Sequence, residues 1–129
     1  MRPLVFGGLL LSGALVVVAG YPWGDHVGHA HWTRVGWVPF LSGPIRPSDL
    51  AGNLLLGVPF GIFAGLGLER SPLIAGAATL ILAVFVEAVQ VYSHSRFPSA
   101  TYVVCIVTGA VAAAALVRVY LRPAPERPS

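Results

Sequence analysis

Charged residues are scarce in this sequence. They make up 10% of its 129 residues, whereas hydrophobic residues make up 56%. A soluble domain carries about 25% charged residues, so the chain lacks the polar groups needed to cover a water-facing surface. Its mean hydropathy is +0.78. The composition therefore excludes a soluble globular domain and predicts a membrane protein, for which the bilayer takes the place of water.

Lysine is absent and cysteine occurs once. The eight basic residues are all arginine and stand at the ends of apolar segments, not in a basic patch, which excludes a nucleic-acid partner. The single cysteine, Cys105, rules out an internal disulfide, and its apolar surroundings predict a small buried residue. The sequence also lacks CxxC pairs, HExxH, phosphate-binding glycine loops and nucleophile elbows, so we expect no cofactor.

Long apolar runs are what the sequence does contain. Four runs approach or reach the length of about 17–25 residues that a transmembrane helix needs, and they cover about residues 4–20, 50–68, 73–92 and 100–121. They predict an all-α polytopic bundle of four transmembrane helices in one domain, residues 1–122, followed by a disordered tail, residues 123–129.

The first run has an alternative interpretation. Arg2 could serve as the basic region of a signal peptide, with Val17 and Ala19 as the small residues of its cleavage site. We favour a retained first span, because the later helices need a partner helix.

The distribution of arginine predicts the orientation. With four spans, five arginines fall on the side of both termini and three on the other side. The two groups are Arg2, Arg70, Arg118, Arg122 and Arg127, and Arg34, Arg46 and Arg96. The positive-inside rule then places both termini in the cytoplasm. We therefore expect the loop between the first two spans and the turn after the third span to face outward.

The loop of residues 21–48 is rich in tryptophan and histidine. Its three tryptophans are typical of a segment at the membrane interface. His26, His29 and His31 form an H-x2-H-x-H pattern with Asp25 as the one nearby carboxylate. A metal site is one interpretation, but the spacing does not match a helical ligand pair. We favour pH-sensitive interfacial side chains and assign no metal.

Polar residues inside the apolar spans are the main candidates for function. An acid at the centre of a membrane helix costs about 2.5–3.5 kcal/mol and needs a partner or a polar cavity. Glu87 is such an acid, and Gln90, three residues later, lies on a similar helix face. Asp49 and Asn53 have the same kind of spacing at the start of the second span. Because antiparallel neighbours bring these residues to a similar depth, we expect one outward polar pocket that also includes Arg96.

Three interpretations of this polar set remain open. In the first, the pocket binds a lipid-linked or lipophilic ligand. In the second, the protein is an enzyme acting on a lipid headgroup, with Glu87 as general acid or base and Arg96 holding an anionic group. In the third, the residues hold the bundle together through a Glu87–Arg96 ion pair and an Asn53–Gln90 hydrogen bond.

Glycines in the second span predict close helix packing. Gly57, Gly61 and Gly65 recur every four residues, which is the small-xxx-small pattern of tightly packed membrane helices. Pro59 cannot donate its backbone hydrogen bond to Leu55 and is expected to kink this helix.

The order of these motifs resembles the VanZ-like family of small bacterial membrane proteins. The resembling pieces are Arg34 with Trp37-Val38-Pro39-Phe40, Asp49 to Asn53 with Leu54 to Gly61, Glu87-Ala88-Val89-Gln90, Arg96, and a final helix with Gly109. The resemblance covers roughly residues 30 to 120. It implies a protein of the bacterial cytoplasmic membrane with a role in the cell envelope. The family is named for a member linked to low-level teicoplanin resistance, so the implied partners are membrane lipids, a lipid-linked envelope ligand or a glycopeptide.

The last helix departs from the family pattern. In VanZ-like proteins this helix usually opens with an aspartate and carries an asparagine one turn later, and residues 99–109 of this chain contain neither. If those groups complete a site in relatives, this chain lacks half of it or uses Thr101, Tyr102 or Thr108 instead.

Overall fold

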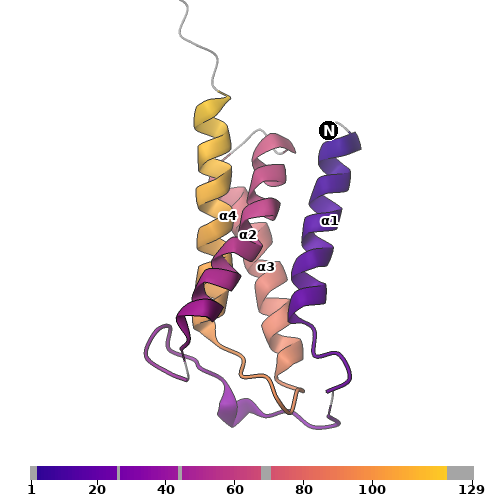
Figure 1. Ribbon diagram of the computed structural model, residues 1–129, viewed down its shortest axis with the longest axis vertical. Coiled ribbons are helices and arrows are strands. Elements are labelled where there is room, and N and C mark those ends of the chain that lie inside the picture. Colours follow the sequence, from indigo (N-terminus) through magenta and orange to yellow (C-terminus); the bar gives the residue numbers. More distant parts are fainter. Residues whose placement is uncertain (1–2, 26, 44, 68–70, 122–129) are drawn as a thin grey trace, which may run out of the picture.

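Four long helices form the body of the protein in the computed structural model, which describes residues 3–25, 27–43, 45–67 and 71–121 (Figure 1). They are α1 (Pro3–Gly20), α2 (Pro47–Gly67), α3 (Pro72–Gln90) and α4 (Ala100–Tyr120), and a short 3-10 turn, η1 (Trp32–Arg34), lies in the first loop. Each long helix has the length and apolar composition needed to cross a membrane. The predicted all-α bundle of four membrane-compatible helices is thus confirmed.

Three of the four long helices begin at proline, Pro3, Pro47 and Pro72, which favours the first turn of a helix. α2 begins at Pro47, three residues before the predicted start at Leu50, because proline in the first turn loses no intrahelical hydrogen bond and has a helical φ. α3 begins at Pro72, and the Ser71 side chain accepts a hydrogen bond of 3.2 Å from the Leu73 amide. This N-cap satisfies one of the free amides of the first turn.

The end of α3 is earlier than the sequence predicted. The helix stops at Gln90, not at Tyr92, and the chain then turns through Ser93 into an irregular segment. His94 therefore does not extend the helical face of Gln90. The predicted end of the second span at residue 68 and the predicted tail at residues 123–129 lie outside the described residues.

The glycine pattern of α2 packs against α4. A Cβ atom at Gly61 would lie 2.7 Å from the Ala110 Cα and 2.8 Å from its carbonyl carbon. Gly57 meets the Ile106 backbone in the same way, and at Gly65 the nearest atom would be the Ala114 Cα, at 3.1 Å. The three contacts advance four residues at a time along both helices, which run in the same direction. Close packing by the small-xxx-small pattern is thereby confirmed.

α1 packs more loosely on the outside of the bundle, beside α2 and α3 (Figure 1). Only Ser12 and Val16 of its residues are buried. Two of its glycines make close contacts. Gly8 lies against the Phe63 ring of α2, and Gly20 lies against the Val86 side chain of α3. Most of α1 therefore presents apolar side chains to the surroundings of the bundle.

The start of α1 and the end of α4 lie at the opposite end of the bundle from the first loop (Figure 1). The loop between α1 and α2 folds across the end where α3 passes into α4. There the Gly36 amide donates to the Pro98 carbonyl at 2.8 Å, and the Ala100 amide donates to the Gly36 carbonyl at 2.9 Å. The Phe40 amide donates to the Thr101 hydroxyl at 2.9 Å. The first loop therefore covers this end of the bundle and is held there by hydrogen bonds of its backbone. The candidate site lies beneath this loop.

Candidate functional site

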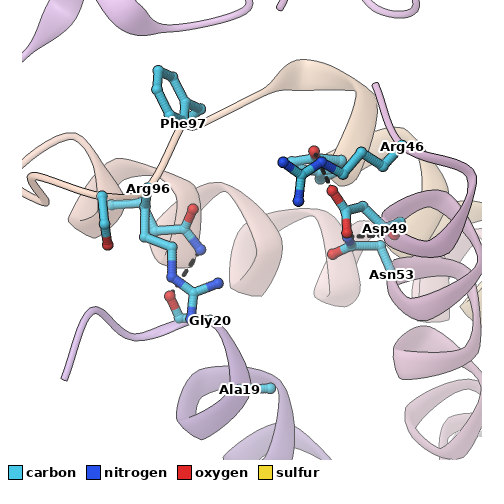
Figure 2. A pocket seen from close by; sticks show the side chains of 10 residues that line it. Ala19, Gly20, Arg46, Asp49, Asn53, Arg96 and Phe97 are labelled. Carbon is cyan, nitrogen blue, oxygen red and sulfur yellow. Dashed lines mark hydrogen bonds between the residues drawn. The ribbon is translucent and has the colours of Figure 1, made fainter. Parts of the chain in front are cut away.

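A polar cavity of about 420 Å³ lies at the loop-covered end of the bundle. All four helices reach it, because α1 and α3 end at this level and α2 and α4 begin there. The residues that line it are Ala19, Gly20, Arg46, Asp49, Asn53, Gln90, Ser95, Arg96, Phe97 and Tyr102 (Figure 2). The cavity combines helix ends with the loop segments next to them.

The structure brings four of the five predicted site residues together. Asp49, Asn53, Gln90 and Arg96 all line this cavity. That they bind a ligand stays a prediction. The fifth residue, Glu87, does not line it and has a different environment.

Glu87 supports the start of α4. Its Oε2 accepts a hydrogen bond of 2.7 Å from the backbone amide of Ser99, the N-cap residue of α4. Its side chain also lines a second, mostly apolar cavity of about 450 Å³, together with Trp32 and Trp37. Glu87 and Gln90 are three residues apart, so their directions differ by about 60° on a helix of 3.6 residues per turn. That angle is enough to place one beside α4 and the other beside α1.

Hydrogen bonds hold the amide and carboxylate groups of the cavity. Gln90 Nε2 donates to the Gly20 carbonyl at 2.8 Å, which ties the end of α3 to the end of α1. Asn53 Nδ2 donates to the Asp49 carbonyl at 2.8 Å, within α2. The Tyr102 hydroxyl donates to Asp49 Oδ2 at 3.3 Å. The Asn53–Gln90 bond expected for a purely structural cluster is therefore replaced by other partners.

Two arginines give the cavity its charge. Arg46 and Arg96 lie on opposite sides of it in Figure 2. Within the described parts of the chain, neither guanidinium forms a hydrogen bond or an ion pair, so the Glu87–Arg96 ion pair does not form either. Asp49 is the one carboxylate in the lining. The cavity therefore carries an excess of positive charge and offers guanidinium donors suited to an anion.

Asp25 fastens the first loop to the turn between α3 and α4. Its Oδ2 accepts hydrogen bonds from the Ser93 hydroxyl at 2.6 Å and from the Ser95 amide at 2.8 Å, and also from the Ser95 hydroxyl. The Ser93 and Ser95 bonds, aided by the charge of His94, hold the pKa of Asp25 well below its usual value. Because Ser95 lines the polar cavity, this carboxylate positions part of the cavity wall.

Arg34 makes a second connection between the same two segments. Its Nη1 donates to the His94 carbonyl at 2.8 Å, and its Cζ atom lies 4.2 Å from the centre of the Phe97 ring. Phe97 is a lining residue of the cavity. Arg34 thus contacts the lining residue Phe97 and the backbone of His94. Arg46 and Arg96, by contrast, line the cavity themselves.

The histidines of the first loop lie beside this turn. His26 is outside the described residues. The His29 and His31 rings have centroids 4.6 Å apart, and the His31 and His94 centroids are 5.8 Å apart. Burial of the His31 ring lowers its pKa, as do the nearby His29, Arg34 and His94. Across the described ranges, no three His, Cys, Asp or Glu side chains are grouped so that they could hold a metal ion.

Sequence reasoning did not assign Arg46 to the site. The residue stands next to Pro47, and in the sequence it was used only to predict the orientation. Since α2 begins at Pro47, Arg46 is held at the mouth of the cavity beside the first turn of the helix. Tyr102 was one of three proposed replacements for the missing polar groups of the last helix, and it is the one that lines the cavity.

Comparison of the chain with protein-family models, with curated proteins and with solved structures gives no match in any of the three searches. The resemblance to the VanZ-like family therefore depends on the motifs and their order alone.

Proposed function

We propose that this chain is a VanZ-like protein of the bacterial cytoplasmic membrane whose outward-facing cavity binds the anionic, phosphate-bearing headgroup of a lipid-linked ligand. The observation that carries the proposal is the pair of arginines, Arg46 and Arg96, in one cavity without a hydrogen-bonded or ion-paired partner among the described residues. Guanidinium groups are well suited to phosphate because they present several donors in a planar arrangement.

The position of the cavity supports a lipid ligand over a soluble one. The cavity lies at the level where all four membrane-compatible helices begin or end. In a bundle that spans the bilayer, helix ends lie at the depth of the lipid headgroups. The proposed orientation, with both termini in the cytoplasm, places this end of the bundle outside. The VanZ-like resemblance adds a role in the cell envelope and a connection to teicoplanin resistance.

The geometry favours binding over acid–base catalysis by Glu87. A general acid or base must come within hydrogen-bond reach of the group that it protonates or deprotonates. Glu87 instead accepts the Ser99 amide and lines the apolar cavity, whereas Arg96 lines the polar one. The two residues that the enzyme hypothesis pairs thus open onto different cavities.

Lipid selectivity in nanodiscs tests this proposal. Phosphatidic acid and phosphatidylcholine would be compared as ligands of the purified protein by native mass spectrometry. We expect preference for phosphatidic acid, and a loss of about tenfold in its affinity for Arg46→Gln or Arg96→Gln, since one charge-assisted contact contributes on the order of 1.4 kcal/mol. Asp49→Asn should strengthen binding, because it removes the negative charge from the cavity.

Arg118→Gln is the matched control. It removes the same charge near the end of α4, far from the cavity along that helix, and should leave selectivity unchanged. Equal affinity for the two lipids, or an equal loss for all three arginine variants, would contradict an anion site in the cavity. A purely structural cluster predicts that the cavity variants lower the stability of the bundle and do not alter lipid selectivity.

A further inference from the structure

An apolar groove of about 450 Å³ runs along the bundle between α1 and α2. Leu11, Leu15 and Val18 of α1 line one side, and Pro59 and Phe63 of α2 line the other. The relative exposure of Leu11 is 74% and that of Val18 is 54%. The groove therefore opens to the surroundings of the bundle, which in a membrane are lipid chains.

The groove and the polar cavity lie at successive levels of α1 and α2. Val18 lines the groove, and the next two residues of α1, Ala19 and Gly20, line the cavity. On α2, Asn53 lines the cavity and Pro59 lines the groove. Six residues separate them, which is about 9 Å of helix. The two spaces thus follow one another along the same pair of helices.

The side of α1 that faces α3 makes close contacts at the level of the polar cavity. Gln90 Nε2 donates to the Gly20 carbonyl, and the Val86 side chain packs against Gly20, so α3 contacts the end of α1 beside the cavity. Among the described residues, no hydrogen bond joins the end of α1 to the start of α2. The groove lies on the other side of α1, between α1 and α2.

The length of the groove matches one leaflet of a bilayer. Its lining on α1 extends from Gly8 to Val18, which corresponds to about 15 Å at 1.5 Å per residue. The hydrocarbon core of a bilayer is about 30 Å thick, so this is about half of it. The one side-chain hydroxyl in the groove, that of Ser12, already donates to the Gly8 carbonyl at 2.7 Å, and the lining is otherwise apolar.

We infer that the groove between α1 and α2 holds one acyl chain of the same anionic lipid whose headgroup occupies the polar cavity. The inference rests on the proposed headgroup site. It adds that the ligand is a membrane-resident lipid, bound head and chain together, which enters laterally from the outer leaflet. The charge of Arg46 and Arg96 selects the headgroup, and the groove fixes the direction of the chain.

Photo-crosslinking locates the chain. The purified full-length protein would be placed in nanodiscs with phosphatidic acid that carries a diazirine at the middle of one acyl chain. Phosphatidylcholine with the same chain is the control for bulk lipid. We expect phosphatidic acid to label the region of Leu11 to Val18 and that of Pro59 to Phe63 several-fold more than the outer faces of α3 and α4, whereas phosphatidylcholine labels all lipid-facing surfaces evenly.

A pair of matched variants tests the groove itself. Leu15→Trp fills the groove, and Leu116→Trp makes the same change at an exposed position of α4 that is 58% exposed. We expect several-fold less crosslinking in the groove for Leu15→Trp, and no change for Leu116→Trp. The labelling pattern of the unmodified protein gives the same information if Leu15→Trp does not fold.

The outcomes separate the two proposals. If the protein does not prefer phosphatidic acid, both the headgroup site and the chain site are wrong. If the preference is present but the chain labels all faces evenly, the headgroup site stands and the groove inference is overturned. If inorganic phosphate displaces the lipid probe as well as unlabelled phosphatidic acid does, the chain adds nothing and the inference is likewise overturned.

Discussion

Gly61 provides a quantitative test of the packing that positions the site. Adding one methyl group, Gly61→Ala, places a Cβ atom 2.7 Å from the Ala110 Cα and 2.8 Å from its carbonyl carbon. These are backbone atoms of α4, so the helices must move apart. Overpacking of this kind costs about 1–3 kcal/mol, against a gain of up to about 1 kcal/mol because alanine favours a helix more than glycine does.

Gly52→Ala is the matched control, since it lies in the same helix and a Cβ atom there meets nothing within 4 Å. It should raise the free energy of unfolding by up to about 1 kcal/mol. The difference between the two variants therefore isolates the steric cost, about 1–3 kcal/mol. Unfolding in mixed micelles, with the denaturing detergent as titrant, measures both variants. A difference smaller than about 0.5 kcal/mol, the usual range of a harmless surface change, would refute close contact of α2 with α4 at Gly61.

Three further predictions concern the covered end of the bundle. Glu87→Leu should lower the free energy of unfolding by about 1–3 kcal/mol, because it leaves the Ser99 amide unpaired. Glu87→Gln should leave that free energy nearly unchanged. Equal losses for the two variants in micelle unfolding would contradict the hydrogen bond between Glu87 and the Ser99 amide. Since the folded-state pKa of Asp25 is lowered, its stabilising effect is complete above its usual pKa of about 3.9 and is lost as the pH falls toward the folded value. Asp25→Asn should therefore lower the melting temperature at pH 7 and flatten its decline below about pH 4, and an unchanged profile in scanning fluorimetry would show that the carboxylate does not fasten the loop. His94→Cys should react with a membrane-impermeant thiol reagent from outside the cell, while the buried Cys105 stays unreactive; labelling from the cytoplasm would reverse the proposed orientation.

The helices and their closest contact follow from patterns that are local in the sequence. Apolar runs of sufficient length predict α1 to α4, and the four-residue recurrence of Gly57, Gly61 and Gly65 predicts a tight helix contact. Such patterns do not show which helix the glycines of α2 pack against. That α2 packs on α4, with both helices in the same direction, depends on the length of the first loop and on small residues in both helices.

Part of the site was also predictable from patterns that are local in the sequence. Polar residues near helix ends must share a cavity or pair, so four of the five candidates lie together. Glu87 differs because a rotation of about 60° along α3 directs it to the Ser99 amide, and sequence spacing alone does not show which neighbour each face meets. Arg46 and the Asp25 cluster belong to loops, whose positions are set by contacts between residues far apart in the chain.

A crystal structure grown from a lipid phase that contains phosphatidic acid tests the headgroup site most directly. The proposed site predicts electron density for a phosphate in the polar cavity, at about 2.7–2.9 Å from the guanidinium nitrogens of both Arg46 and Arg96. Density for ordered water alone in that cavity, with the lipid phosphate bound elsewhere on the bundle, would contradict it.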